Sequence, residues 1–128
     1  MRPSNGQRGS SAVEFALVLP LVLLLLLALV QVGVLARDQL VLTQASRAGA
    51  REAAVEASGG AVEDAVRGAA VGLDGDRLRV EIVRAGARGS PVTVSLEYEA
   101  PIAATLAGWL FPESVTLRVS ATMRQEFA

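Results

Sequence analysis

Few residues of this chain could do chemistry, because it contains neither cysteine nor histidine. Within it, disulfides, thiolate chemistry, imidazole bases and the usual zinc ligands are excluded. Glu97 and Glu99 lie two residues apart, a spacing that places both carboxylates on one face of a strand, where they could exchange protons or hold a cation. The simpler alternative, which we favour, is a solvated strand face beside Arg79 or Arg118.

The remaining candidates for a reaction centre are weaker. Asp74 and Asp76, in the segment LDGD, could form half of a calcium loop, but the further oxygen ligands and the closing glutamate are missing. No serine has a partner base, and no glycine-rich phosphate loop follows a strand. We therefore expect no catalytic residue, no metal and no cofactor, and hence no enzyme. Nucleic acid is not an expected partner, since the net charge is −1 and the twelve basic residues, all arginine, are scattered singly.

One acid stands where a charge is costly, at the start of a long apolar run. Residues 15–36 form a stretch of 22 residues without a formal charge. As a helix rising about 1.5 Å per residue, this stretch covers the ~30 Å hydrocarbon core of a bilayer. Glu14 precedes it directly, and Ser11 and Glu14 together form S-x-x-E, the pattern of a capping box. In this interpretation Glu14 accepts a hydrogen bond from an orphan backbone N–H at the start of the helix.

The helix is predicted to continue beyond the apolar run. Residues 37–57 are rich in alanine and free of proline, and the glycines that follow Ser58 are typical of a helix end. The expected helical rod has about 45 residues and, at a rise of about 1.5 Å per residue, is roughly 70 Å long. Its transmembrane part covers residues 10–36 and its extramembrane continuation residues 37–58. Pro20 lies in the apolar part and is expected to bend or loosen the helix there.

Residues 59–128 are predicted to form a small α+β head. Apolar residues three and four apart indicate a short amphipathic helix within residues 60–76. Alternating apolar and polar residues then predict three strands, at residues 78–82, 92–98 and 115–123. The fold class is therefore α+β, with a long N-terminal helix, a short helix and a three-stranded antiparallel sheet. One face of this sheet needs a cover, which the short helix and the lower part of the long helix can supply.

The N-terminal stretch resembles the TadE-like family, pilin-related proteins of the bacterial tight-adherence (Tad, or Flp-type) pilus machinery. The likeness runs over residues 9–57, and a looser likeness covers residues 115–126. Its most specific parts are the pattern G-x4-E-F, with Gly9, Glu14 and Phe15 in register, and the proline of LVLP, Pro20. The resemblance implies a pilin-like fold and cleavage by a prepilin peptidase between Gly9 and Ser10, which removes residues 1–9 as a leader.

The resemblance also implies a role for the acid. After cleavage, Ser10 would carry a new ammonium group, and Glu14 would lie about one helical turn away on the same face. Glu14 could pair with its own amine or with that of a neighbouring subunit, and the cost of an unpaired carboxylate in a low-dielectric setting would select one axial register. Small residues of the extramembrane part would let neighbouring helices approach closely, namely Ala45, Ala48, Gly49 and Ala53.

The expected function is that of a non-catalytic minor pilin or pseudopilin that assists assembly of a Tad pilus. Its partners would be the membrane, the prepilin peptidase, pilin subunits and other Tad assembly proteins. The basic residues flanking the apolar run are nearly balanced, so their charge does not decide the orientation. The resemblance places a single-pass protein in the cytoplasmic membrane, with its N-terminus in the cytoplasm and its head outside, where it joins or primes the fibre.

Two other functions stay open from the sequence. A V-x-A triplet ends at Ala36, so that signal peptidase cleavage after Ala36 would release a secreted binding domain. The apolar run is longer than the core of an ordinary signal peptide, which is 7 to 15 residues. The other alternative is a membrane-tethered enzyme that uses Glu97, and it lacks a nucleophile and a base.

Overall fold

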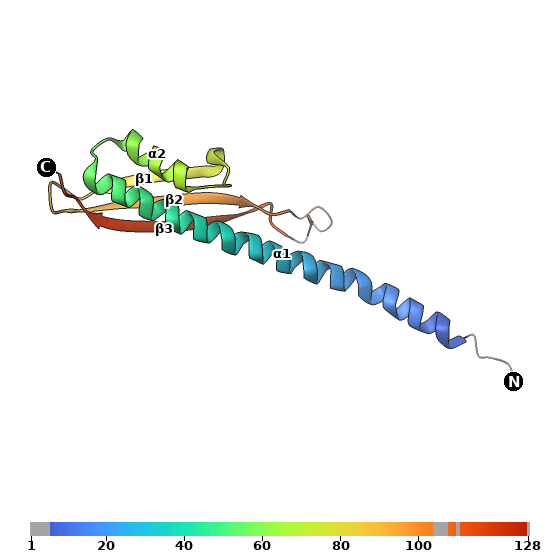
Figure 1. Ribbon diagram of the computed structural model, residues 1–128. Helices are drawn as coiled ribbons and strands as arrows, with labels where there is room; N and C mark the ends of the chain where they lie inside the picture. Colours follow the sequence, from blue (N-terminus) through green and yellow to red (C-terminus); the bar gives the residue numbers. More distant parts are fainter. Residues whose placement is uncertain (1–5, 104–107, 110, 128) are drawn as a thin grey trace. The chain divides into compact units, whose positions relative to one another are not determined.

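A computed structural model of the protein describes residues 6–103, 108–109 and 111–127 (Figure 1). Helix α1 spans Gly6–Val55 and helix α2 spans Gly59–Ala69. A 3-10 turn, η1, at Gly75–Arg77 leads into three strands. These strands are β1 (Leu78–Arg84), β2 (Pro91–Pro101) and β3 (Ser114–Arg124). The α+β class, with one long helix, one short helix and a three-stranded antiparallel sheet, is confirmed.

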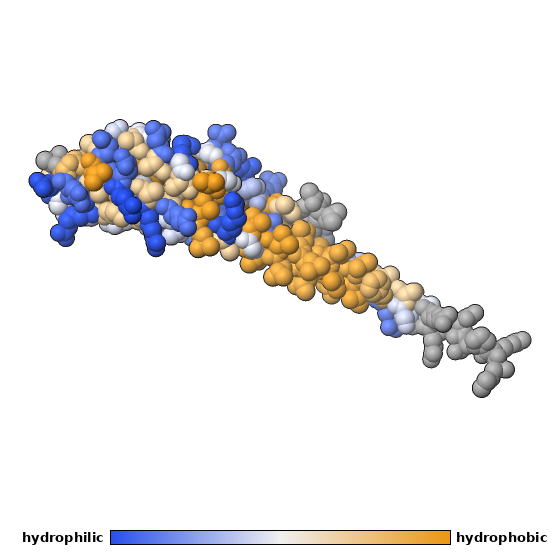
Figure 2. Space-filling view, in the orientation of Figure 1, coloured by the Kyte–Doolittle hydropathy of each residue, from blue (hydrophilic) through white to orange (hydrophobic). Residues whose placement is uncertain are grey.

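The chain divides into two compact units, Met1–Val34 and Leu35–Ala128. In the described part of the first unit, α1 exposes nearly all of its large apolar side chains from Val13 to Val34. Figure 2 shows these apolar side chains gathered over the N-terminal half of α1. The helix is long and apolar enough to cross a membrane, and none of its most apolar window is buried inside the chain. Pro20 lies inside α1 without interrupting it.

The second unit is built on a sheet with the order β1-β2-β3, in which both pairs of neighbours are antiparallel. Leu96 at the centre of β2 lies opposite Val80 of β1 and Val119 of β3. On β2 the predicted alternation is complete, because Val92 and every second residue after it up to Ala100 are buried, while the residues between them point to the other face. The sheet therefore has one apolar face and one polar face.

The apolar face is covered by the end of α1 and by α2. The core joins buried residues of these helices to those of the sheet; on the helices they include Leu42, Ala45, Ala50, Ala53, Val62 and Val66. Gly49 is the point of closest approach. A Cβ atom added there would lie 2.5 Å from Val66 Cγ2 of α2 and 3.2 Å from Val94 Cγ1 of β2. The missing side chain thus lets α1 contact both elements at once.

This packing corrects one expectation about the small residues of α1. They were expected to face neighbouring subunits, but Ala45, Gly49 and Ala53 are buried against the chain's own head, and Ala48 is half-buried. The physical reason is the same in both cases, because small side chains allow close approach of any apolar partner. The nearest partner available to them is the apolar face of the sheet.

The end of α1 also differs from the sequence prediction. The helix ends at Val55, and Ser58 forms the N-cap of α2 by accepting a hydrogen bond from the backbone N–H of Ala61. Gly59 and Gly60 therefore lie in the first turn of α2 and do not terminate α1. Serine is strongly preferred at an N-cap, and here that preference decides the boundary.

The carbonyl groups at the end of α1 accept hydrogen bonds from residues that are distant in the sequence. Arg84 at the end of β1 donates from Nη1 to the carbonyl oxygen of Ala53 at 2.7 Å and from Nη2 to that of Glu56 at 3.0 Å. The N–H of Glu126 donates to the Ala54 carbonyl at 2.7 Å, and the ring of Phe127 lies 5.3 Å from the Arg84 guanidinium. A cation at this helix end satisfies orphan carbonyls and complements the helix dipole.

We predict that Gly49→Leu lowers the free energy of unfolding of the head by several kcal/mol, because the new side chain has no space between α1, Val66 and Val94. Thermal unfolding of the full chain in detergent, followed by circular dichroism, measures the effect. Gly68→Ala is the matched control, since a Cβ there meets no atom within 4 Å and alanine is the better helix former. Equal melting temperatures for the two variants would contradict the close approach at Gly49.

Arg84→Met is predicted to destabilise the head by about 1–2 kcal/mol, because it keeps the length of the side chain but leaves carbonyl groups of α1 without their charged donor. Arg88→Met removes an exposed arginine from the nearby β1–β2 loop and controls for the change of net charge. Unfolding curves in urea compare the two variants. A loss of stability as large in Arg88→Met as in Arg84→Met would show that the cap contributes nothing specific.

Candidate functional site

The predicted processing site lies at the start of α1. Gly9 and Ser10 are both helical and exposed, and a Cβ atom added at Gly9 would meet no atom within 4 Å. The first five residues of the expected leader lie outside the described residues, whereas the helix already includes Gly6. The peptide bond between Gly9 and Ser10 therefore lies at the exposed beginning of a helix, free of tertiary packing among the described residues.

Ser10 and Glu14 are in contact across one turn of this helix. The hydroxyl of Ser10 donates a hydrogen bond to Oε1 of Glu14 at 3.3 Å. The side chain of Glu14 is exposed, as is that of Phe15 beside it. The carboxylate is thus held one turn from the residue that would become the N-terminus after cleavage. Its part in assembly, and that of Phe15, stay predictions.

The capping box expected at Ser11 is wrong for the uncut chain. Helix α1 begins at Gly6, so Ser11 is already inside the helix and cannot serve as its N-cap. The residues before Ser11 extend the helix, which moves the unpaired N–H groups of its first turn upstream of Glu14. Pro20 follows inside the same continuous helix. The bend predicted at Pro20 also stays a prediction.

In the head, the acids that could have formed a reaction centre lie on the polar face of the sheet. Glu97 of β2 lies opposite Arg79 of β1 and Arg118 of β3, and its Oε2 is 3.1 Å from Arg118 Nε. Glu99 is exposed and lies opposite Thr116. Arg79, Glu97 and Arg118 line a shallow, open depression on the polar face. The geometry agrees with the solvated, salt-bridged strand face favoured from the sequence.

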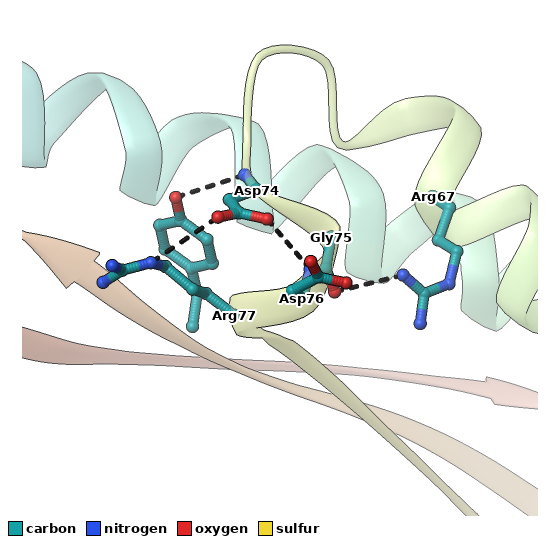
Figure 3. A network of polar contacts seen from close by, with 6 residues as sticks. Arg67, Asp74, Gly75, Asp76 and Arg77 are labelled. Carbon is teal, nitrogen blue, oxygen red and sulfur yellow. Dashed lines mark hydrogen bonds and ion pairs between the residues drawn. The ribbon is translucent and has the colours of Figure 1, made fainter.

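The second acidic pair shapes the turn before β1 (Figure 3). One oxygen of Asp74 accepts from the backbone N–H of Asp76 at 3.0 Å, and the other lies 3.6 Å from Arg77 Nε. The N–H of Asp74 donates to the hydroxyl of Tyr98 at 3.3 Å, and Arg67 donates to the Gly75 carbonyl at 3.2 Å. Both carboxylate oxygens of Asp74 are thus engaged within the turn, while Tyr98 and Arg67 tie η1 to the sheet and to α2.

A metal centre has no support in the described part of the chain, where no group of three or more acidic, histidine or cysteine side chains is placed to hold an ion. The residue that sequence reasoning missed is Arg84. Its acceptor on Ala53 is 31 residues away in sequence, so no local spacing points to the contact.

Comparison with known proteins supports the N-terminal assignment. Residues 9–51 match the family model described as TadE-like protein. The match begins at the predicted processing glycine, includes the whole apolar run and ends two residues beyond Gly49. Neither a curated protein nor a solved structure matches the chain. The resemblance to the TadE-like family predicted from the sequence is confirmed over residues 9–51.

Proposed function

We propose that this protein is a minor pilin or pseudopilin that assists assembly of a Tad (Flp-type) pilus and has no catalytic activity of its own. The observation that carries the proposal is the TadE-like segment 9–51, which combines the G-x4-E-F pattern, the apolar run and the helix that continues into the head. The acids of the head support a non-catalytic role, because Glu97 is paired with Arg118 and Asp74 is engaged in a turn.

The membrane is the proposed environment of the first unit. Its large apolar side chains have no cover within the chain, and exposed apolar surface of this extent is typical of contact with lipid or with another protein. A helix satisfies its own backbone hydrogen bonds, so it can cross the bilayer. We place the N-terminus in the cytoplasm and the head outside, an orientation that the resemblance implies because the family's peptidase cuts at the cytoplasmic face.

Cleavage after Gly9 would change the chemistry of the helix start. The leader would be lost, and Ser10 would carry an ammonium group one turn from Glu14, with which its side chain already forms a hydrogen bond. Ser11 could then become the N-cap of the shortened helix, with Glu14 at the third helical position, as in the capping box that the uncut chain lacks. Processing would thus give the Glu14 carboxylate two partners, the amine of Ser10 and an unpaired backbone N–H of the first helical turn.

The proposed partner of Glu14 in the fibre is the amine of a neighbouring subunit. Removing a charge from water without a partner is costly, so a subunit that offers its amine at the right height is favoured over one that does not. We assign the lateral contacts between neighbouring subunits to the first unit. The small residues Ala45, Gly49 and Ala53 are already committed to the chain's own core.

A second candidate function is that of a secreted binding domain released after Ala36. It is favoured by one observation, the boundary between the compact units, which falls between Val34 and Leu35. A chain that began at Arg37 would keep all the buried helical residues of the core and lose Leu35, which packs against it. The two functions differ in the residue with which the mature protein begins.

We predict that protein recovered from membranes containing a prepilin peptidase begins at Ser10, as measured by N-terminal sequencing and intact mass. Gly9→Leu should abolish this cleavage. Gly33→Ala is the matched control, since neither glycine has an atom within 4 Å of its added Cβ and both variants should fold alike. A mature protein that begins at Arg37 and is found in the culture medium would establish the second candidate instead.

Glu14→Gln is predicted to leave insertion, helix content and processing intact and to reduce the number of assembled pili at least about tenfold, because the variant keeps the shape of the side chain but cannot compensate an amine. Electron microscopy and the amount of pilin in the sheared surface fraction measure the effect. Glu99→Gln removes a charge from the exposed polar face of the sheet and serves as the control. Normal pili in the Glu14→Gln strain would rule out the charge pair as an assembly device.

A further inference from the structure

The second unit exposes large apolar side chains at only a few described positions. Five of them are more than half exposed, namely Leu40, Val55, Val71, Val83 and Trp109. Trp109 is the extreme case, at 85% exposed, and it is the only tryptophan of the chain. Exposed tryptophan is unusual on a surface that faces water alone, which raises the question of where these residues lie in the head.

Two of the five lie at the end of the head that is farthest along α1. Val55 is the last residue of α1. Val83 lies on β1 next to Arg84, which donates to the Ala53 carbonyl in the last turn of the same helix. Val55 and Val83 thus lie near the capped end of α1.

Leu40 and Val71 lie at the opposite end, where α1 enters the second unit. Arg37 is in the first turn of this part of the helix, and its guanidinium lies against Gly72, where an added Cβ would be 2.6 Å from Nη2. Val71 precedes Gly72 directly. Leu40 follows Arg37 by three residues, which is about one helical turn.

Trp109 belongs to the same end. It lies in the β2–β3 connection, whose base is closed by a hydrogen bond from the Ile102 N–H to the Glu113 carbonyl. The sheet end that carries this connection is near η1, since Tyr98 accepts from the N–H of Asp74, two residues after Gly72. Figure 1 shows the end of β2 and the start of β3 at the end of the sheet away from the last turn of α1. The sequence carries no charge from residue 101 to residue 112.

Arg37 directly follows the apolar run in the sequence, and Leu40 follows it by four residues. Residues 15–36 would fill the hydrocarbon core, so Leu40 would lie only four residues, or about 6 Å of helix rise, beyond its edge. The headgroup layer of one leaflet is about 5–8 Å thick. Tryptophan is enriched in that layer, and arginine can keep its charged end there while its stem lies along apolar groups.

We propose that Leu40, Val71 and Trp109, together with Arg37, form a lipid-contacting surface that rests in the headgroup layer of the bilayer. This surface is a second membrane contact, made by the head in addition to the spanning helix. The inference rests on the proposed membrane-spanning role of residues 15–36. Lipid is the occupant that fits, because Arg37 and Leu40 follow the apolar run along α1 and the surface combines a tryptophan and an arginine with aliphatic groups.

Trp109 itself reports on the surface, because no other tryptophan contributes to the emission of the chain. We expect that, in the full chain reconstituted in phosphatidylcholine vesicles, bromine atoms on the upper part of the lipid acyl chains quench Trp109 emission about twofold or more, as befits an interfacial tryptophan. Aqueous iodide should quench it less than it quenches free tryptophan. Resistance to extraction with carbonate shows in the same sample that the helix has inserted.

Single-cysteine labels give an independent test, since the chain has no cysteine of its own. Val71→Cys and Val83→Cys are matched, because both replace exposed valines of the second unit, one at each end. In vesicles, a polarity-sensitive nitrobenzoxadiazole label on Val71→Cys should emit further to the blue than the same label on Val83→Cys. The same label on Val83→Cys should keep the emission of a probe in water.

The outcomes separate this inference from the proposed function. A chain that resists carbonate extraction while Trp109 stays unquenched by lipid and the Val71→Cys label stays in water would overturn the surface and leave the spanning helix in place. A chain that carbonate extracts would overturn both. A blue shift that appears only at high protein density and vanishes when lipid is in excess would identify a protein contact and refute the lipid contact.

Discussion

The head of this protein depends on the close approach between α1 and the central strand β2. At Gly49 the helix presents no side chain, so Val66 of α2 and Val94 of β2 both reach its backbone. Strands β1 and β3 each form hydrogen bonds with β2 and not with each other. Contacts that fix β2 against the helix therefore fix the whole sheet. Arg84, at the end of β1, adds a second link between sheet and helix by donating hydrogen bonds to the carbonyl groups at the end of α1.

One helix thus meets two different demands. In its first part the apolar side chains lie outside, where a hydrocarbon solvent suits them, and in its second part the apolar residues are small and turned inward. The TadE-like match ends at residue 51, within the helix, and the sheet lies outside it. The segment that matches the family contains the exposed apolar part of α1 and its first buried contacts with the head.

Sequence periodicity was sufficient for the elements but not for their partners. Alternation predicted the three strands because a half-buried strand repeats every two residues. The spacing of Ser10 and Glu14 predicted that they lie one helical turn apart on the same face. The direction of the small residues of α1 could not be predicted, since Ala45 and Gly49 would look the same against another subunit. At Ser58 two local signals competed, and the N-cap of α2 prevailed. The cap from Arg84 depends on tertiary structure alone.

The polar face and the edges of the sheet have a consequence for solubility. Strand β3 is an edge of eleven residues, long enough to pair with a strand of another molecule. It carries Arg118 and Arg124 and no acidic residue, so antiparallel alignments of two copies that bring these arginines opposite each other are opposed by charge. Sheet growth through these alignments, a route to amyloid-like aggregates, is thereby opposed.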